Sequence, residues 1–300
     1  MNKNLVRTGI GLTVGLSLLI TSTVMGMAKG PTGYEALKSA VKNSERIENA
    51  TFSMSGSLKD NNKEFTKLTS TIKVAQNEAA SGNISIDTDT VDKSYTFFGN
   101  ENNIVFRDND SDIYNKITCP EESRKSRNCD SKEHKNPQME ALCESVLDAL
   151  VGDLKNQVTL KDIGDGNKQI SINLEKDEIP AVFNLLLNAK DEESSVECKS
   201  SEKISKIFGI NPKDLELPEL TSNIQAEKVD VQFVVDEDNI IKEIDIEFDV
   251  TGNDAQDQVH NQNAKLSFDV SSINSTTADT VDLNGKKVKE ISSKEFDCED

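Results

Sequence analysis

The sequence has few of the residue types from which catalytic sites are built. It contains no Trp and only two His, His134 and His260, among its 300 residues. His134 stands in a basic stretch and His260 in the polar stretch 253–263, so both are expected to be exposed loop residues. Neither His has a Ser or Cys in a recognisable nucleophile context, and no G-x-S-x-G motif occurs. A phosphate-binding glycine loop is also absent, because the stretch 164–166 is typical of a hairpin turn. We therefore predict that the protein is not an enzyme, has no catalytic residues and uses no cofactor.

Metal-binding patterns are incomplete as well. Residues 108–112 begin like a calcium loop, but Ile113 and Cys119 stand where such a loop needs its central Gly and its last acidic residue. The other ligand-type residues match the spacing of no closed zinc module; they are Cys119, Cys129, His134 and Cys143. We predict no metal site.

Positive charge is scarce, since 53 acidic residues face 34 basic ones and the net charge is −19. Such an acidic surface argues against binding nucleic acid or anionic lipid headgroups by charge. One basic stretch stands out at 118–137, which includes Arg124, Lys125 and Arg127 and has no large apolar residue. This stretch is either a long solvated loop or a contact patch for an acidic partner or a cell-wall polymer.

The first 28 residues have the features of an export leader. Lys3 and Arg7 precede the uncharged run Thr8–Ala28, and small residues at Gly26 and Ala28 suit cleavage after Ala28. We predict a cleaved signal peptide, with an uncleaved membrane anchor as the alternative. No Cys follows the apolar run, which excludes a lipoprotein anchor. In either case, the rest of the chain is expected to be extracellular or on the cell surface.

Five Cys occur in the chain, and an exported protein can oxidise them. Cys119 and Cys129 bracket a short loop and could form a disulfide. Cys143 and Cys198 could pair only if the fold brings them together, and Cys298 is left over. The pairing is not fixed by the sequence, and reduced thiols remain an alternative for all five.

A period-two alternation of apolar and polar residues indicates strands over much of the chain. It is clearest at 229–235, 244–250 and 266–270, where acidic residues alternate with Val, Ile and Phe. Similar short strands are expected between Phe52 and Ile117. A hairpin is expected from 158 to 174, with its turn at 164–167.

Four helices are predicted from caps and apolar stripes. Thr32 and Glu35 form a capping box before the stripe 34–47, and further helices are expected at 139–154, 179–187 and 204–208. The simplest arrangement is an α+β fold, in which a single curved antiparallel sheet, a half-barrel, carries helices packed on its concave face.

We expect this domain to span 29–291, with a polar loop insertion at 118–137 and a flexible tail at 292–300. Two smaller domains divided near residue 136 are the alternative.

The order of these elements resembles the LolA-like half-barrel. The leader, the opening Gly33–Lys38 and the stretch Asn49–Phe52 before the first strand are particularly similar to uncharacterised exported proteins of Gram-positive (clostridia-like) bacteria in that family. The family also includes lipoprotein carriers and surface lipid-carrying lipoproteins, so the resemblance implies a fold that holds lipid. The chain departs from it by having no lipobox Cys and by its basic, Cys-bearing stretch.

The two predicted helices at 179–187 and 204–208 carry bulky apolar residues that must lie against the sheet. If they fit tightly they form ordinary core, and if they fit loosely they form an apolar pocket. We predict an exported cell-envelope protein that binds a lipid or acyl chain between sheet and helices. The expected lining residues are Phe183, Leu186, Leu187, Ile207 and Phe208. The alternative is a non-enzymatic cell-surface structural or interaction protein that contacts wall polymer or a protein partner through 118–137.

Overall fold

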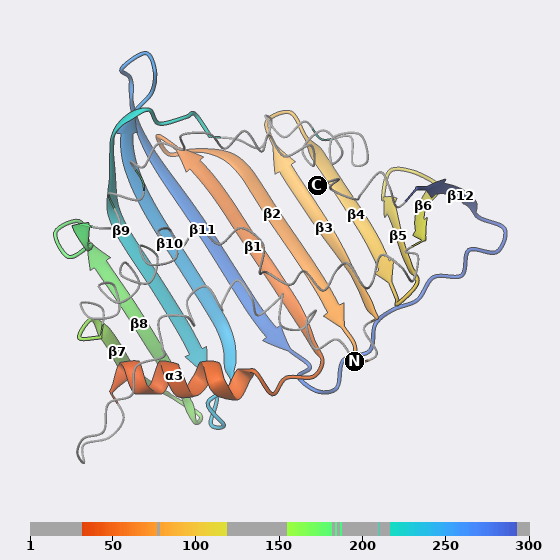
Figure 1. Cartoon of the computed structure of the whole chain (residues 1–300), viewed down its shortest axis with the longest axis horizontal. Coiled ribbons are helices and arrows are strands. Elements are labelled where there is room, and N and C mark those ends of the chain that lie inside the picture. Colours follow the sequence, from red (N-terminus) through yellow and green to blue (C-terminus); the bar gives the residue numbers. More distant parts are fainter. Residues whose placement is uncertain are drawn as a thin grey trace, which may run out of the picture.

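The computed structural model describes residues 32–76, 79–118, 155–181 and 217–292, together with Asn184, Leu187 and Ile210. Within these residues the chain forms helix α3 (Gly33–Ser44) and twelve strands (Figure 1). The strands are β1 (Ala50–Asp60), β2 (Lys63–Val74), β3 (Ala80–Thr88), β4 (Asp92–Gly99), β5 (Asn103–Asp108), β6 (Ile113–Thr118), β7 (Val158–Gly164), β8 (Asn167–Glu175), β9 (Ser222–Val235), β10 (Ile241–Asn253), β11 (Val259–Ser271) and β12 (Lys287–Ile291).

The twelve strands form one sheet made of two antiparallel meanders. Strands β1 to β6 lie in sequence order, as do β7 to β11, and the pairing of β1 with β11 joins the two sets. Strand β12 then pairs with β6 in the parallel direction. The outermost strands, β12 and β7, do not pair with each other, so the sheet is mixed and does not close.

The predicted α+β fold, with helices filling the concave face of an antiparallel half-barrel, is therefore wrong. Most of the described residues lie in strands, α3 is the one helix that is described throughout, and the sheet contains a parallel pair. Ala181, Asn184 and Leu187 are also helical, and they lie within the helix predicted at 179–187. The reason lies in strand length: β9, β10 and β11 each run for 13 or 14 residues, well beyond the alternating segments. The predicted helix at 139–154 and that at 204–208 lie outside the described residues.

Helix α3 begins at the predicted capping box. The hydroxyl of Thr32 accepts from the backbone N–H of Glu35 at 3.2 Å, and the Glu35 carboxylate accepts from the Thr32 N–H at 3.0 Å. These bonds satisfy two backbone donors that a helix start leaves free. The helix ends at Ser44, three residues before the predicted end. Its buried stripe includes Ala36, Leu37 and Ala40 and packs mainly against β7, β8 and β10.

The strand predictions for the second meander are confirmed at 229–235, 244–250, 266–270 and in the β7–β8 hairpin. Two features differ from expectation. The polar stretch around His260 belongs to strand β11, which begins at Val259. Strand β12 was not predicted, because its sequence Lys287–Ile291 has only one buried residue and no clear two-faced pattern.

The predicted leader at 1–28 lies outside the described residues. So do the predicted loop at 118–137, except for Thr118 at the end of β6, and the predicted tail at 292–300, except for Ser292. No helix in the described parts of the chain is long and apolar enough to cross a membrane.

Candidate functional site

The strand register gathers the apolar side chains on one face of the sheet, here called the apolar face. Residues opposite each other in an antiparallel ladder point to the same side, so cross-strand partners can be followed from one strand to the next. One such row, the central row, crosses nine strands from β7 to β4. Its members are Leu160, Ile170, Phe233, Ile244, Phe268, Met54, Ser70, Ile84 and Tyr95.

The apolar face divides into two parts according to what lies on it. Over β7 to β10, here called the helix-covered part, α3 crosses one end of the strands (Figure 1). Ile170 and Phe233 there are 0% and 1% exposed and belong to the main hydrophobic core. Over β1 to β3, here called the half-buried part, the face carries large side chains of intermediate exposure. These are Phe52, Met54, Leu58, Leu68, Ile72, Ile84 and Ile86.

Ser70 is the one small polar residue of the central row. It lies on β2 between Met54 and Ile84, and it is 5% exposed. Its hydroxyl has no hydrogen-bond partner among the residues that the structure describes. A buried hydroxyl without a partner costs about 1–3 kcal/mol in lost hydration, so native proteins rarely keep one without a reason.

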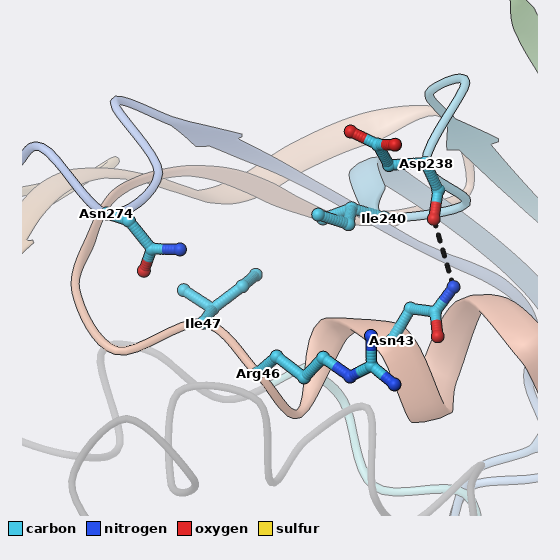
Figure 2. Close-up of a pocket in the computed structure, with 6 residues that line it drawn as sticks. All are labelled: Asn43, Arg46, Ile47, Asp238, Ile240 and Asn274. Carbon is cyan, nitrogen blue, oxygen red and sulfur yellow. Dashed lines mark hydrogen bonds between the residues drawn. The ribbon is translucent and has the colours of Figure 1, made fainter.

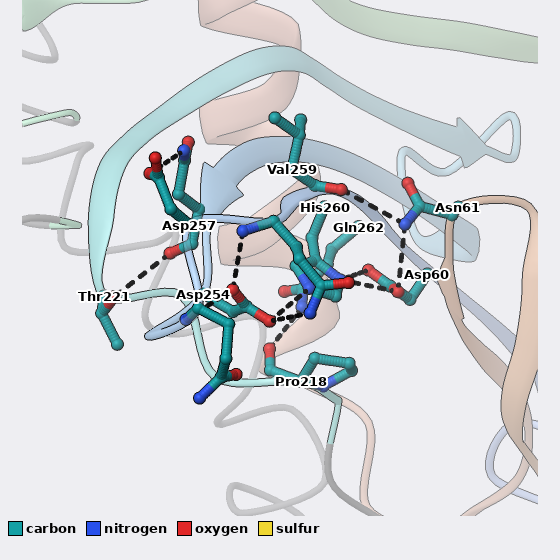
Figure 3. Close-up of polar contacts among 12 residues, drawn as sticks. Asp60, Asn61, Pro218, Thr221, Asp254, Asp257, Val259, His260 and Gln262 are labelled. Atoms are coloured by element: carbon teal, nitrogen blue, oxygen red, sulfur yellow. Dashed lines mark hydrogen bonds and ion pairs between the residues drawn. The ribbon is translucent and has the colours of Figure 1, made fainter.

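A polar cluster ends the apolar face on β1 and β11, at the tips of the strands away from α3 (Figure 3). Nδ1 of His260 lies 2.8 Å from a carboxylate oxygen of Asp60, and its Nε2 lies 3.3 Å from one of Asp254. The three side chains are only 12%, 7% and 13% exposed. The cluster thereby joins the β1–β2 turn to the β10–β11 loop. Beside it, Gln262 donates to the carbonyl of Pro218, just before β9.

Both ring nitrogens of His260 face carboxylates, which can only accept hydrogen bonds, so this arrangement suits the doubly protonated imidazolium. The hydrogen bond to Asp60 is the main cause that raises the pKa of His260, and the bond to Asp254 adds to it. The pKa of Asp254 is lowered, mainly by the backbone N–H of Gln258 and then by His260. The two turns are therefore held together by charge.

The opposite side of the sheet, here called the polar face, carries ion pairs across the strands. On β10 the Glu247 carboxylate lies 2.8 Å from the ammonium of Lys265 and 3.2 Å from that of Lys228. Asn263 also donates to it, at 3.0 Å. The bond from Lys265, with those from Lys228 and Asn263, lowers the pKa of Glu247 to about 2. These pairs keep the charged residues of β9 to β11 on the solvent side.

A small cavity of about 220 Å³ lies at the other end of the strands, where α3 ends beside the β9–β10 turn (Figure 2). Asn43 bridges its rim by donating to the carbonyl of Asp238 at 2.9 Å. Ligand sites usually enclose about 300–1,000 Å³, so this cavity is too small for a lipid. Its lining consists of Asn43, Arg46, Ile47, Asp238, Ile240 and Asn274.

Of the five predicted ligand-lining residues, Leu187 lies among the described residues. It is half-buried and packs against the main core, beside the helix-covered part. The other four lie outside the described residues: Phe183, Leu186, Ile207 and Phe208. Cys119 and Cys129 of the possible disulfide lie outside them too. The pocket lining and the disulfide therefore stay predictions.

The sequence held signals for the two polar features that were missed. Ser70 interrupts the apolar alternation between Leu68 and Ile72 and so indicates a polar position on the apolar face. Counting back by twos from Leu266 reaches His260, which places this His on the same face.

No group of three or more His, Cys, Asp or Glu side chains within the described ranges could hold a metal ion. In comparisons with known proteins, no family model and no curated protein sequence matches the chain.

Proposed function

We propose that this chain is an exported cell-envelope protein that binds a hydrophobic ligand, a lipid or acyl chain, on the half-buried part of its apolar face. The observation that supports this most is the continuity of that face. The same rows of apolar side chains that form a closed core under α3 continue over β1 to β3, where they are only half-buried. Each Å² of this apolar surface that a ligand removes from water contributes about 25 cal/mol to the free energy of binding.

The dimensions of the surface suit an acyl chain. On β1 the apolar positions run from Phe52 to Leu58, which at the rise of a strand is roughly 20 Å. The hydrocarbon of one bilayer leaflet is about 15 Å thick, half of the core of a membrane. An extended chain can therefore lie along β1 and β2 without reaching the charged cluster at Asp60 and His260.

Ser70 indicates the chemistry of such a ligand. Its hydroxyl, which has no partner within the described parts of the chain, lies in the middle of the half-buried part, between Met54 and Ile84. An ester carbonyl or a hydroxyl of the ligand would supply the missing hydrogen bond, whereas a plain hydrocarbon would not. The proposal therefore favours an acyl ester or another lipid with a polar group within reach of an apolar chain.

A binding titration with paired variants tests the proposal. The chain from Lys29 onward is titrated with a fluorescent fatty-acid ester. Leu68→Glu places a charge on the half-buried part, and Thr69→Glu places the same charge one residue along β2, on the polar face. We expect Leu68→Glu to weaken binding at least about tenfold, since a buried unpaired charge is strongly unfavourable. Thr69→Glu should change it less than about twofold.

A second pair of variants controls for the case in which the first pair misfolds. Ile84→Gln and its neighbour Ser85→Gln repeat the comparison on β3 with uncharged side chains. The unchanged chain and all four variants must be shown to unfold cooperatively before their affinities are compared. The proposal fails if the chain shows no saturable binding, or if folded variants of both faces bind equally well.

A further inference from the structure

At the end of the sheet formed by β5, β6 and β12, here called the corner (Figure 1), two cationic side chains contact one tyrosine. A guanidinium nitrogen of Arg107 donates to the hydroxyl of Tyr114 at 3.5 Å, and the ammonium of Lys286 donates to it at 3.2 Å. Both charges also lie near the ring, 5.3 Å and 4.6 Å from its centroid. Three polar groups from three segments of the chain therefore converge at one point.

These two cations have no acidic partner among the residues that the structure describes. Neither Arg107 nor Lys286 forms an ion pair with a carboxylate within the described parts of the chain, although the protein is acidic overall. By contrast, Lys116, two residues along β6 from Tyr114, pairs with Glu290 at 3.1 Å. Two like charges that share one acceptor repel each other, and an anion between them would remove that repulsion.

The hydroxyl of Tyr114 completes the arrangement. A phenol has one proton to donate and can accept two hydrogen bonds. Because Arg107 and Lys286 both donate to its oxygen, its own proton is directed elsewhere and can bind a further acceptor. The corner thus offers a guanidinium, an ammonium and an O–H donor.

We propose that Arg107, Tyr114 and Lys286 form a binding site for a phosphate group. A phosphate has more acceptor oxygens than a carboxylate and carries up to two negative charges, so it can bind several donors at once. The site lies at the opposite end of the sheet from α3 and does not depend on lipid binding to the apolar face. Lys286 is exposed, so the ligand can reach the site from solvent.

The test is a calorimetric titration of the chain from Lys29 onward with inorganic phosphate, against sodium chloride at matched ionic strength. We expect saturable binding to phosphate that weakens at least about tenfold in the double variant Arg107→Gln/Lys286→Gln, which loses two charge-assisted hydrogen bonds. Tyr114→Phe keeps the ring on which the cations stack but loses the O–H, and we expect about a threefold weakening or more.

Lys287→Gln is the matched control. Lys287 is the neighbour of Lys286, but its partner on β6 is Ile113 and not Tyr114. Lys287 therefore belongs to the opposite face of the sheet from Tyr114. This variant removes the same charge from the same corner and should change affinity less than about twofold. The proposal is overturned if Lys287→Gln weakens binding as much as the double variant does, since overall electrostatic attraction would then explain the effect. It is also overturned if neither inorganic phosphate nor the phospholipid vesicles described next bind.

The source of the phosphate group is settled by repeating the measurement with vesicles. Vesicles of phosphatidylglycerol are compared with vesicles of neutral phosphatidylcholine, again with the double variant. Phosphatidylglycerol-specific binding that needs Arg107 and Lys286 identifies a lipid headgroup, whereas saturable binding to inorganic phosphate alone identifies a small phosphate compound. If Leu68→Glu loses vesicle binding and the double variant does not, the vesicles bind through the apolar face and not through this site. If neither ligand discriminates the double variant from the unchanged chain, the site does not exist.

Discussion

The helix-covered and half-buried parts of the apolar face have the same sequence pattern but different surroundings. Ile170 and Phe233 in the first and Met54 and Ile84 in the second lie in one row and alternate with polar neighbours in the same way. Under α3 the side chains are buried, whereas over β1 to β3 they are half-buried. Period-two alternation thus reveals which face is apolar, but it does not reveal what lies against that face.

The difference also separates stability from binding. Side chains in a closed core contribute to folding through packing that no ligand needs to complete. Half-buried side chains contribute less to folding and leave area that a ligand can still remove from water. Substitutions in the two parts should therefore differ in their effect on the free energy of unfolding.

The largest effect is expected for Phe233→Ala in the helix-covered part. Phe233 is 1% exposed at the centre of the main core, so its truncation should lower the free energy of unfolding by about 3–5 kcal/mol. Urea denaturation followed by circular dichroism measures this. Val234→Ala, next to it on the polar face, is the control and should cost less than about 1 kcal/mol. Equal losses for the two variants would mean that this face holds no closed core.

Gly33→Ala should have the next largest effect, because α3 approaches β7 closely at this residue. A Cβ atom at position 33 would lie 2.3 Å from the carbonyl oxygen of Val158, so the helix start must move away. Overpacking of this kind costs about 1–3 kcal/mol. Ser39→Ala, on the exposed side of the same helix, serves as the control. A stability for Gly33→Ala equal to that of the control would show that α3 does not pack on the sheet.

His260→Gln should lower the melting temperature by a few degrees, and the loss should depend on pH. The folded-state pKa of His260 is raised, so its contribution is fully present below its unfolded pKa of about 6.5 and is lost as pH rises through the folded value. The pKa of Asp254 is lowered, so its contribution is present above about pH 4 and is lost as pH falls through its folded value.

The gap in melting temperature between the unchanged chain and His260→Gln should therefore be widest between about pH 4 and pH 6.5 and should shrink as pH rises through the folded-state pKa of His260. Thermal scans across this range check the prediction, with Val259→Thr as a control whose gap stays constant. A gap that widens as pH rises would show that His260 is neutral in the folded protein.

The smallest effect is expected for Leu68→Ala in the half-buried part, at about 1 kcal/mol, because this side chain is already partly in contact with water. Thr69→Ala on the polar face is the control in the same urea experiment. A saturating fatty-acid ester should stabilise the unchanged chain more than Leu68→Ala. A loss of about 3 kcal/mol or more without ligand would place Leu68 in a closed core and would remove the contrast between the two parts.

Local features of the fold could be predicted from the sequence. The capping box at Thr32 and the alternation at 229–235, 244–250 and 266–270 are set by neighbouring residues, and the structure contains all of them. Features that join distant segments could not be predicted. Strand β12 pairs with β6 across a separation of more than 170 residues, and β12 has no apolar pattern that would predict this pairing.

The polar features of the site show the same limit. His260 reads as an exposed loop residue because Asp60, which binds its ring, lies 200 residues away in the sequence. Ser70 is unusual only because the strands beside it place Met54 and Ile84 on either side of a buried hydroxyl. The fold class was wrong for a related reason: alternation and stripes predict elements singly, whereas the breadth of the sheet depends on pairing between them.

The most direct test of the central claim is to ask what the protein carries when it is purified. The chain from Lys29 onward is isolated without detergent, extracted with organic solvent, and the extract is analysed by mass spectrometry beside extracts of Leu68→Glu and Thr69→Glu. We expect a lipid or fatty-acid ester in stoichiometric amount from the unchanged chain and from Thr69→Glu, and little from Leu68→Glu. A lipid-free extract from a folded chain that also binds no added ester would contradict it, and the half-buried part would then have no role in ligand binding.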